Sequence, residues 1–172
     1  MKLILVFIAT LLSAFTIYSQ TSSEKFKFHS VSASPNLGIV KGSTTLGGEA
    51  DIVFSKGKHL FKLVAAVGSE AESCFGLCRS VSFTTYDLMY GREFGKLESI
   101  SFDVFAGVGY FYVRYPDPNN SDYRKENTIG FPVQARLRFM AAKKFNLGIH
   151  MGGNINGTSS LIAFGPFFQW TP

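Results

Sequence analysis

Residues 127–139 read NTIGFPVQARLRF, and along this stretch two kinds of side chain alternate at every step. One set is apolar and consists of Ile129, Phe131, Val133, Ala135, Leu137 and Phe139. The intervening set consists of Thr128, Gly130, Pro132, Gln134, Arg136 and Arg138. Successive side chains of a β-strand point to opposite faces. The stretch therefore predicts a strand that separates an apolar environment from a polar one.

The same alternation recurs through much of the chain after residue 20. It is clear in residues 45–55, 59–69, 99–115 and 145–156, less clean in 81–90 and 161–170, and weakest in 26–34. The chain is also rich in Phe (18), Tyr (7) and Gly (17), a composition that favours pleated strands and tight turns. We expect an all-β fold with eight strands at residues 26–34, 45–55, 59–69, 79–91, 98–115, 127–140, 145–156 and 160–171.

The N-terminus carries the pattern of a secretory signal peptide. Lys2 is followed by an apolar run over residues 3–12 and by small or polar residues up to Gln20. The run is shorter than the ~20 apolar residues of a membrane-spanning helix. We predict a signal peptide at residues 1–20 and one β-barrel domain at residues 21–172; an uncleaved anchor is the alternative. Removing Lys2 lowers the formal net charge from +5 to +4, and the scattered Lys and Arg residues do not indicate nucleic-acid binding.

The alternation fits either a soluble sandwich, which turns its apolar face inward, or a membrane barrel, which turns that face toward lipid. Loop lengths favour the barrel. Long connections are expected at 35–44, 70–78 and 116–126, with a smaller one at 157–159, and short ones at 56–58, 92–97 and 141–144. Alternating long outer loops and tight periplasmic turns are typical of eight-stranded up-and-down transmembrane barrels.

Aromatic residues and charges support the same topology. The predicted periplasmic strand ends carry aromatic residues suited to an interfacial girdle. These are Phe26, Phe28, Phe54, Phe61, Tyr90, Phe94, Phe102, Phe139, Phe145, Phe168 and Trp170. The polar faces would point three acids and three bases into the barrel, where buried charges must be paired. These are Glu49, Asp51, Lys62, Asp103, Arg136 and Arg138. On a soluble sandwich the same six would be solvated surface charges.

The leader, the eight alternating strands and the loop pattern resemble the small outer-membrane β-barrels typified by the OmpA and OmpX barrel domains. The leader ending in Tyr18-Ser-Gln20, residues 129–139 (IGFPVQARLRF) and residues 152–156 (GGNIN) are also similar to uncharacterised barrel proteins of Bacteroidetes. This resemblance implies an outer-membrane location and contact with lipid and with the barrel-insertion machinery. The chain departs from the pattern by ending in Thr171-Pro172 rather than on an aromatic residue. Pro132 and Pro166, inside predicted strands, suggest bulges or kinks.

Two candidate sites stand out from the strand pattern. Cys74 and Cys78 lie in one predicted outer loop of an exported chain, which favours a disulfide over free thiols. His150 faces the predicted interior. Some eight-stranded outer-membrane barrels, the lipid A deacylases, use a His with a Ser two residues later, but here that position is Gly152. We interpret His150 as an interior histidine with hydrogen-bond partners and predict no catalytic, cofactor or metal site.

The sequence leaves three hypotheses for function. The first is a non-enzymatic envelope protein with a closed, ion-paired interior, which has a structural role or binds an extracellular ligand through its outer loops. The loop at residues 115–124 is polar and carries Tyr residues that suit a partner, but an ordinary solvated turn is the favoured interpretation of it. The second is a soluble periplasmic carrier with an apolar interior. The third is a lipid-modifying outer-membrane enzyme with His150 or a loop residue as its base. We favour the first.

Overall fold

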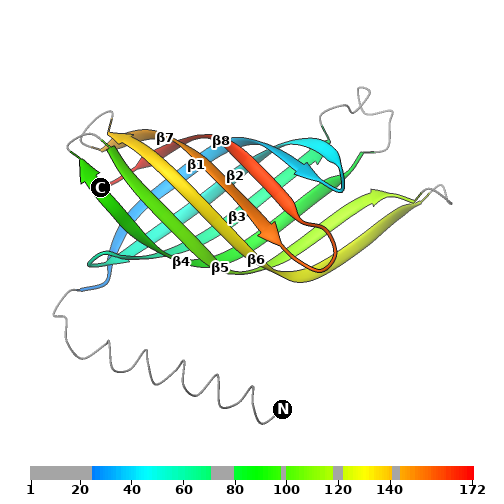
Figure 1. Ribbon diagram of the computed structural model, residues 1–172, viewed down its shortest axis with the longest axis horizontal. Helices are drawn as coiled ribbons and strands as arrows, with labels where there is room; N and C mark the ends of the chain where they lie inside the picture. The colour runs from blue at the N-terminus through cyan, green and yellow to red at the C-terminus, as the bar shows by residue number, and fades with distance from the viewer. Residues whose placement is uncertain (1–24, 71–79, 98–99, 118–121, 141–143) are drawn as a thin grey trace, which may run out of the picture.

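The computed structural model describes residues 25–70, 80–97, 100–117, 122–140 and 144–172. They form one closed barrel in which each strand pairs antiparallel with the next and the last pairs with the first (Figure 1). The strands are β1 (Lys27–Val40), β2 (Ser43–Lys56), β3 (His59–Glu70), β4 (Ser82–Leu97), β5 (Ile100–Pro116), β6 (Tyr123–Met140), β7 (Phe145–Ile155) and β8 (Leu161–Trp170). The predicted signal peptide, Cys74 and Cys78 lie outside the described residues. In the described part of the chain, no helix is long and apolar enough to cross a membrane.

The alternation read from the sequence sorts side chains between the outside and the lumen of the barrel. Ile129 on β6 points outward with 68% of its surface exposed, whereas Lys62 on β3 points inward and is 0% exposed. The outer face is apolar over every strand, and the lumen holds nearly all of the buried polar side chains. The eight-stranded antiparallel barrel predicted from the sequence is confirmed.

The first strand and the connection after it differ from the prediction. β1 continues through Pro35 to Val40, so the expected long loop at residues 35–44 is wrong. The turn consists of Lys41 and Gly42, both with positive φ (53° and 80°). A two-residue turn of this kind matches the right-handed twist of the strands that it joins. The alternation continues through residues 35–40, but the small and polar residues Pro35, Asn36 and Gly38 resemble a loop in sequence.

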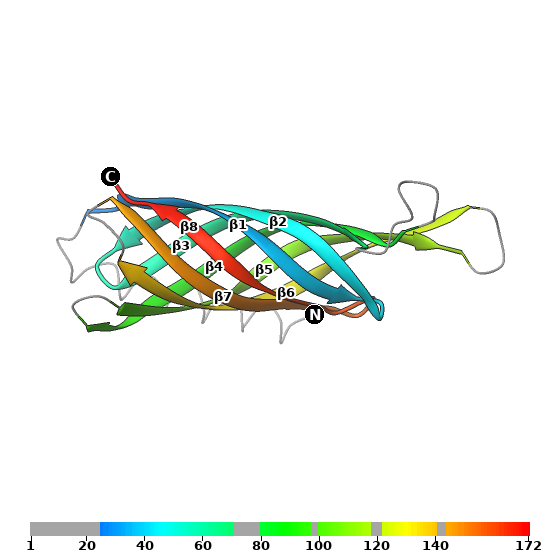
Figure 2. The same cartoon turned by 90° about the horizontal axis from the view of Figure 1, so that it is seen from above.

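Strands β4, β5 and β6 are also longer than predicted. β4 continues to Leu97, through the expected turn at 92–97, and a register shift after Phe94 accommodates this extension. β5 and β6 extend as a hairpin beyond the rest of the barrel, and the hydrogen bond from Asp117 N to Asp122 O (3.1 Å) continues it (Figure 2). Strands therefore occupy Pro116 and residues 123–126 of the loop expected at 116–126. The predicted strands end too early because these strands continue beyond the apolar outer belt, where their residues are charged and polar.

Prolines interrupt the ladder without ending the strands. Pairing between β1 and β8 stops after Ala33↔Phe168 and resumes at Leu37↔Phe164, a register that sets Pro35 opposite Pro166. Neither proline has an N–H to donate, so the two carbonyls lose their cross-strand partners. Pro132 coincides with a second gap, between Ala106↔Val133 and Gly109↔Gly130. The expected bulges at Pro132 and Pro166 are missing ladder bonds instead, and the register shift that β1 does contain lies near Phe28.

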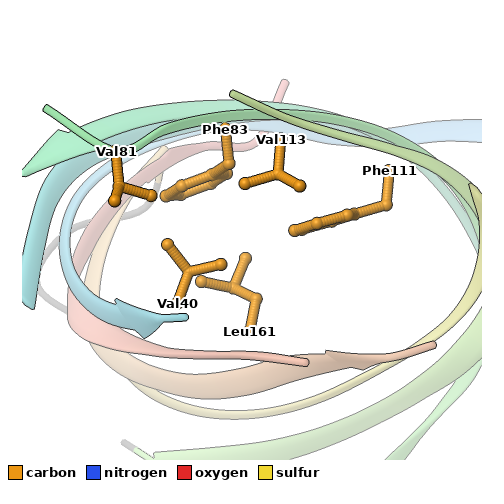
Figure 3. Packing of buried hydrophobic residues seen from close by; sticks show 6 residues of the cluster. All are labelled: Val40, Val81, Phe83, Phe111, Val113 and Leu161. Carbon is orange, nitrogen blue, oxygen red and sulfur yellow. The ribbon is translucent and has the colours of Figure 1, made fainter. Parts of the chain in front are cut away.

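Buried apolar side chains close the outer end of the lumen. Six side chains from β1, β4, β5, β8 and the residue before β4 point toward one another across the barrel (Figure 3). This outer plug consists of Val40, Val81, Phe83, Phe111, Val113 and Leu161. A second apolar cluster, Val53, Leu60, Val64, Met89 and Phe105, lies within the lumen. The outer plug leaves the polar part of the lumen separated from the outer rim.

Restoring the donors at the β1–β8 seam is expected to stabilise the barrel. In Pro35→Val and Pro166→Val each new N–H faces a carbonyl, and each bond contributes about 0.5–1.5 kcal/mol. The double variant should unfold at a higher urea concentration than the wild type. Its free energy of unfolding should be larger by about 1–2 kcal/mol, after subtracting the stabilisation that the prolines give by restricting the unfolded chain. The fluorescence of Trp170, the single tryptophan, reports unfolding in detergent micelles. Equal midpoints for the wild type and the double variant would contradict the proposed loss of hydrogen bonds.

Candidate functional site

The centre of the lumen holds a cluster of two carboxylates and two cations. From β6, Arg136 contacts Asp51 and reaches Glu49 Oε1 at 2.9 Å, both on β2. From β3, Lys62 Nζ lies 3.0 Å from Glu49 Oε1 and 3.5 Å from Asp51 Oδ2. Lys62, Asp51 and Arg136 are buried. Four of the six charged residues predicted to face the barrel interior thus contact one another.

Uncharged side chains extend this lumen cluster. The amide oxygen of Gln134 accepts hydrogen bonds from Lys62 Nζ and from Arg136 Nε (3.1 Å). Its amide nitrogen therefore faces Glu49 Oε1 (3.0 Å) and His150 Nδ1 (3.0 Å) and donates to both. Since Nδ1 of His150 accepts, the ring proton lies on Nε2 and is directed at Ser34 Oγ, 2.6 Å away. His150 is thus oriented by both ring nitrogens.

The remaining two predicted charges form a separate group nearer the end of the barrel where the chain enters and leaves. Arg138 Nη2 lies 3.1 Å from Asp103 Oδ2 and 3.1 Å from Glu93 Oε1, and Arg138 Nε donates to Ser101 Oγ at 2.8 Å. His29 Nε2 lies 3.4 Å from Arg138 Nη1. The sequence analysis did not include Glu93, which it had placed in a turn. The structure therefore divides the six charges between two groups inside the barrel.

Asp87 is a further lumen carboxylate that the sequence analysis missed. It lies on the inner face of β4 between Thr85 and Met89. The inner face of this strand also carries Val81, Phe83 and Met89, which are buried. The mixture of apolar and polar residues on one face concealed the alternation in residues 81–90. The pattern that could have placed Asp87 on the inner face was the run of Tyr86, Leu88 and Tyr90 on the opposite face.

The predicted aromatic girdle lies on the outside of the barrel at the end where the chain enters and leaves. Aromatic rings contact one another from β8 across to β4, with centroids 5.5–6.1 Å apart. The rings in contact are Trp170, Phe28, Phe54, Phe26, Phe61 and Tyr90. Phe102, Phe139 and Phe145 are exposed on the outer face of β5, β6 and β7, and Phe168 is exposed on that of β8. Their assignment to a membrane interface remains a prediction.

The outer rim carries a second set of polar contacts, beyond the apolar belt. Glu126 accepts a hydrogen bond from Tyr115 and pairs with Lys41 Nζ at 3.2 Å, which together hold the pKa of this carboxyl below its usual value. Lys41 Nζ also lies 4.4 Å from the centre of the Tyr115 ring. These contacts link the β1–β2 turn to the β5–β6 hairpin.

Farther along the hairpin, cations lie exposed beside aromatic rings. The Arg114 guanidinium lies 3.8 Å from the centre of the Tyr123 ring. Arg114 and Lys125 are cross-strand partners and both are exposed, an arrangement of like charges that destabilises a strand pair. Arg124 Nε lies 3.3 Å from Asp117 Oδ2, and the pKa of Arg124 is raised by this carboxylate. We call Lys41, Arg114, Arg124 and Lys125 the rim cations.

The described residues contain no group of three or more His, Cys, Asp or Glu side chains arranged to hold a metal ion. The His150–Ser34 pair is the arrangement nearest to a catalytic one. A serine nucleophile needs an unprotonated histidine nitrogen facing its hydroxyl. Here Gln134 holds the proton on the nitrogen that faces Ser34, and both side chains are only 3% exposed. The geometry therefore favours a hydrogen-bonding role for this pair.

Removing Arg136 is expected to destabilise the barrel strongly. Arg136→Leu leaves Glu49 and Asp51 with Lys62 alone, and breaking a buried ion pair on one side costs about 3–5 kcal/mol. The control is Arg124→Leu, which breaks an exposed pair that contributes little because solvent screens it. Urea unfolding in micelles, followed by Trp170 fluorescence, compares the two. An equal loss of stability in both variants would mean that the lumen cluster contributes no more than a surface pair.

Neither a protein-family model nor a curated protein sequence matches this chain. Solved structures do match it. Neisserial surface protein A superposes with a TM-score of 0.67 at 7% identity, covering 86% of this chain and 97% of that one. The N-terminal β-barrel domain of Pseudomonas aeruginosa OprF gives 0.57 at 13% identity, with 85% and 100% covered. The attachment invasion locus protein Ail of Yersinia pestis gives 0.59 at 12% identity, with 86% and 98% covered.

At these identities the likeness concerns the fold. Each of these structures covers most of this chain and nearly all of its own length, so no large part of either barrel is left over. The closed eight-stranded barrel, with its apolar outer face, agrees with the comparison. The chain has the fold of the small eight-stranded outer-membrane β-barrels.

Proposed function

We propose that this chain is a non-enzymatic protein of the bacterial outer membrane whose outer rim binds an anionic surface ligand. The observation that carries the membrane part is the distribution of side chains between the two faces of the wall. The outside is apolar over all eight strands, and the lumen holds Lys62 and Arg136 in ion pairs. Lipid is the environment that this outside fits. The predicted export signal is consistent with this location.

The carrier alternative requires the opposite arrangement. A carrier of an apolar ligand lines its cavity with apolar side chains. In this barrel the lumen centre is filled by the ion-paired lumen cluster, and the outer end is occupied by the outer plug. A large apolar groove of about 620 Å³ lies mainly on the outer wall, between residues such as Leu37, Leu137 and Phe164. These features argue against an internal apolar ligand.

The enzyme alternative rests on His150, the third of our sequence hypotheses. Its ring faces Ser34 with the protonated nitrogen, and both groups lie inside the lumen, surrounded by the lumen cluster. The groove on the outer wall is lined in part by His150 but not by Ser34, whose side chain faces the lumen. We therefore assign this pair a structural role within the proposed function.

The ligand class follows from the rim cations. Arg114 and Lys125 are paired on the exposed face of the projecting hairpin, where their mutual repulsion is uncompensated by a carboxylate directly opposite. Bound sulfate or phosphate groups would remove this repulsion, and Arg is suited to bind such groups with two N–H donors. The Tyr123 ring orients the Arg114 guanidinium. In a comparable case, Ail was crystallised with the heparin analogue sucrose octasulfate, with a TM-score of 0.57 at 12% identity, covering 84% of this chain and 98% of that one.

The membrane part is tested by electrophoresis of membrane-extracted protein with and without boiling. A folded transmembrane barrel resists cold SDS, so the unboiled sample should migrate at a different apparent size from the boiled one. The protein should also be recovered with outer membranes rather than in the periplasmic fraction. Recovery as a soluble protein without a mobility shift would contradict an outer-membrane location.

The ligand part is tested with heparin as the probe, on folded protein in micelles. Arg114→Ala with Lys125→Ala should weaken heparin binding by about tenfold, equivalent to ~1.4 kcal/mol for two charge-assisted contacts. The control removes two cations at the opposite end, Lys56→Ala with Lys58→Ala, in the β2–β3 turn region. Binding should weaken as salt rises, because these contacts are exposed. Equal losses in both double variants would assign binding to net charge rather than to the rim.

A further inference from the structure

The lumen contains more carboxylates than cations. Between the outer plug and the end of the barrel where the chain enters and leaves, five acids face inward from the described strands, namely Glu49, Asp51, Asp87, Glu93 and Asp103, against three bases, Lys62, Arg136 and Arg138. Each acid except one has a Lys or Arg nitrogen within 4.0 Å. The exception among the described residues is Asp87, whose Oδ2 accepts a hydrogen bond from Thr85 (3.2 Å) and whose Oδ1 has no partner. A buried charge without a partner is costly, so this carboxylate needs either a proton or a compensating cation.

Asp87 lines a small chamber between the lumen cluster and the outer plug. The cavity has a volume of about 40 Å³. Its walls include Glu49, Gln134 and His150 from the lumen cluster, and Phe83 and Leu161 from the outer plug. This volume exceeds the ~10–15 Å³ that one water molecule needs, so the chamber has room for a small ion and its water.

Two further polar groups on the wall of this chamber lack partners. Asn36 from β1 and Asn154 from β7 both line it and are 5% and 3% exposed. Asn36 Oδ1 and Asn154 Nδ2 make no hydrogen bond among the described residues. Native proteins satisfy nearly all such buried groups, by protein, water or ion. Two unpartnered oxygens, of Asp87 and Asn36, and one donor, of Asn154, therefore line the same cavity.

Glycines on the neighbouring strands make room for these polar side chains. A Cβ at Gly109 would lie 1.8 Å from Asp87 Oδ1, one at Gly130 would lie 1.9 Å from Asn154 Oδ1, and one at Gly47 would lie 2.7 Å from Asn36 Oδ1. Any larger residue would displace the polar group. The chamber's polar wall thus depends on three glycines from three different strands.

We propose that this chamber binds a monovalent metal cation of the Na⁺ class. The donors are one carboxylate oxygen and one amide oxygen, which suit hard cations that prefer oxygen ligands. A single unpaired carboxylate matches a single positive charge, whereas calcium sites in proteins draw on several carboxylates and carbonyls. Water bound to the ion accepts the hydrogen bond of Asn154 Nδ2. The ion links β1, β4 and β7 across the lumen.

The test compares unfolding in sodium chloride and choline chloride of equal ionic strength. The protein is refolded from urea into micelles in each salt, so that the chamber closes around whichever cation fits, and choline is too large for it. Wild-type protein should unfold several degrees higher in sodium chloride, because an ion that binds only the folded state stabilises it. Asp87→Asn should show equal unfolding temperatures in the two salts. A matched control, Asp122→Asn, removes one exposed carboxylate at the rim and should keep the sodium effect.

A second variant keeps the test decisive if Asp87→Asn does not fold. Asn36→Leu preserves the volume and the carboxylate but removes the amide oxygen, and it should lose most of the sodium effect. The proposal is overturned if the wild type unfolds at the same temperature in both salts, which would mean that a proton or water alone occupies the chamber. It is also overturned if Asn36→Leu keeps the full sodium effect, or if only calcium chloride stabilises the wild type.

Discussion

The structure depends on a strand register that places the charged side chains inside the barrel. A one-residue slip of any strand would turn its inner face outward. For β3 and β6 such a slip would bring Lys62, Arg136 and Arg138 to the apolar outer face; in the outer membrane proposed above, a cation there at mid-membrane depth would cost about 2–4 kcal/mol each. Buried ion pairs contribute little net stability compared with apolar packing. We infer that the lumen cluster contributes mainly to choosing the register, because every other register separates these charges from their partners.

This constraint explains how the seam tolerates opposed prolines. The closure of β1 on β8 loses ladder bonds around Pro35 and Pro166, yet its register is the one that brings Ser34 to His150 and Ser32 to Arg136. Both contacts link β1 to side chains of β6 and β7 across the lumen. Side-chain hydrogen bonds inside the barrel thus hold the seam where backbone bonds are missing. On the outer wall the same gap coincides with the apolar groove.

Alternation predicted the faces of most strands well because it depends only on strand geometry and on the contrast between lipid and lumen. It predicted the ends of strands poorly. Residues 35–40 extend β1 although they contain Pro35, Asn36 and Gly38, and the extended β5–β6 hairpin leaves the apolar belt, where no contrast between faces remains. Asp87 was missed because its neighbours on the inner face, Phe83 and Met89, are apolar. Pairing across the lumen, such as Arg136 with Asp51, depends on the barrel's curvature and shear, which the sequence pattern does not contain.

Polarity changes along the barrel axis as well as across the wall, and this ordering separates stability from binding. From the periplasmic end inward, the lumen contains the Arg138 group, the lumen cluster, the Asp87 chamber and then the apolar outer plug. The plug isolates the inner charges from the rim, so substitutions at Arg114 or Lys125 act on exposed groups that no inner pair requires. The hairpin is therefore free to change its charges without loss of the barrel's register. Under the proposed function, ligand binding and folding depend on different residues, which lie on opposite sides of the plug.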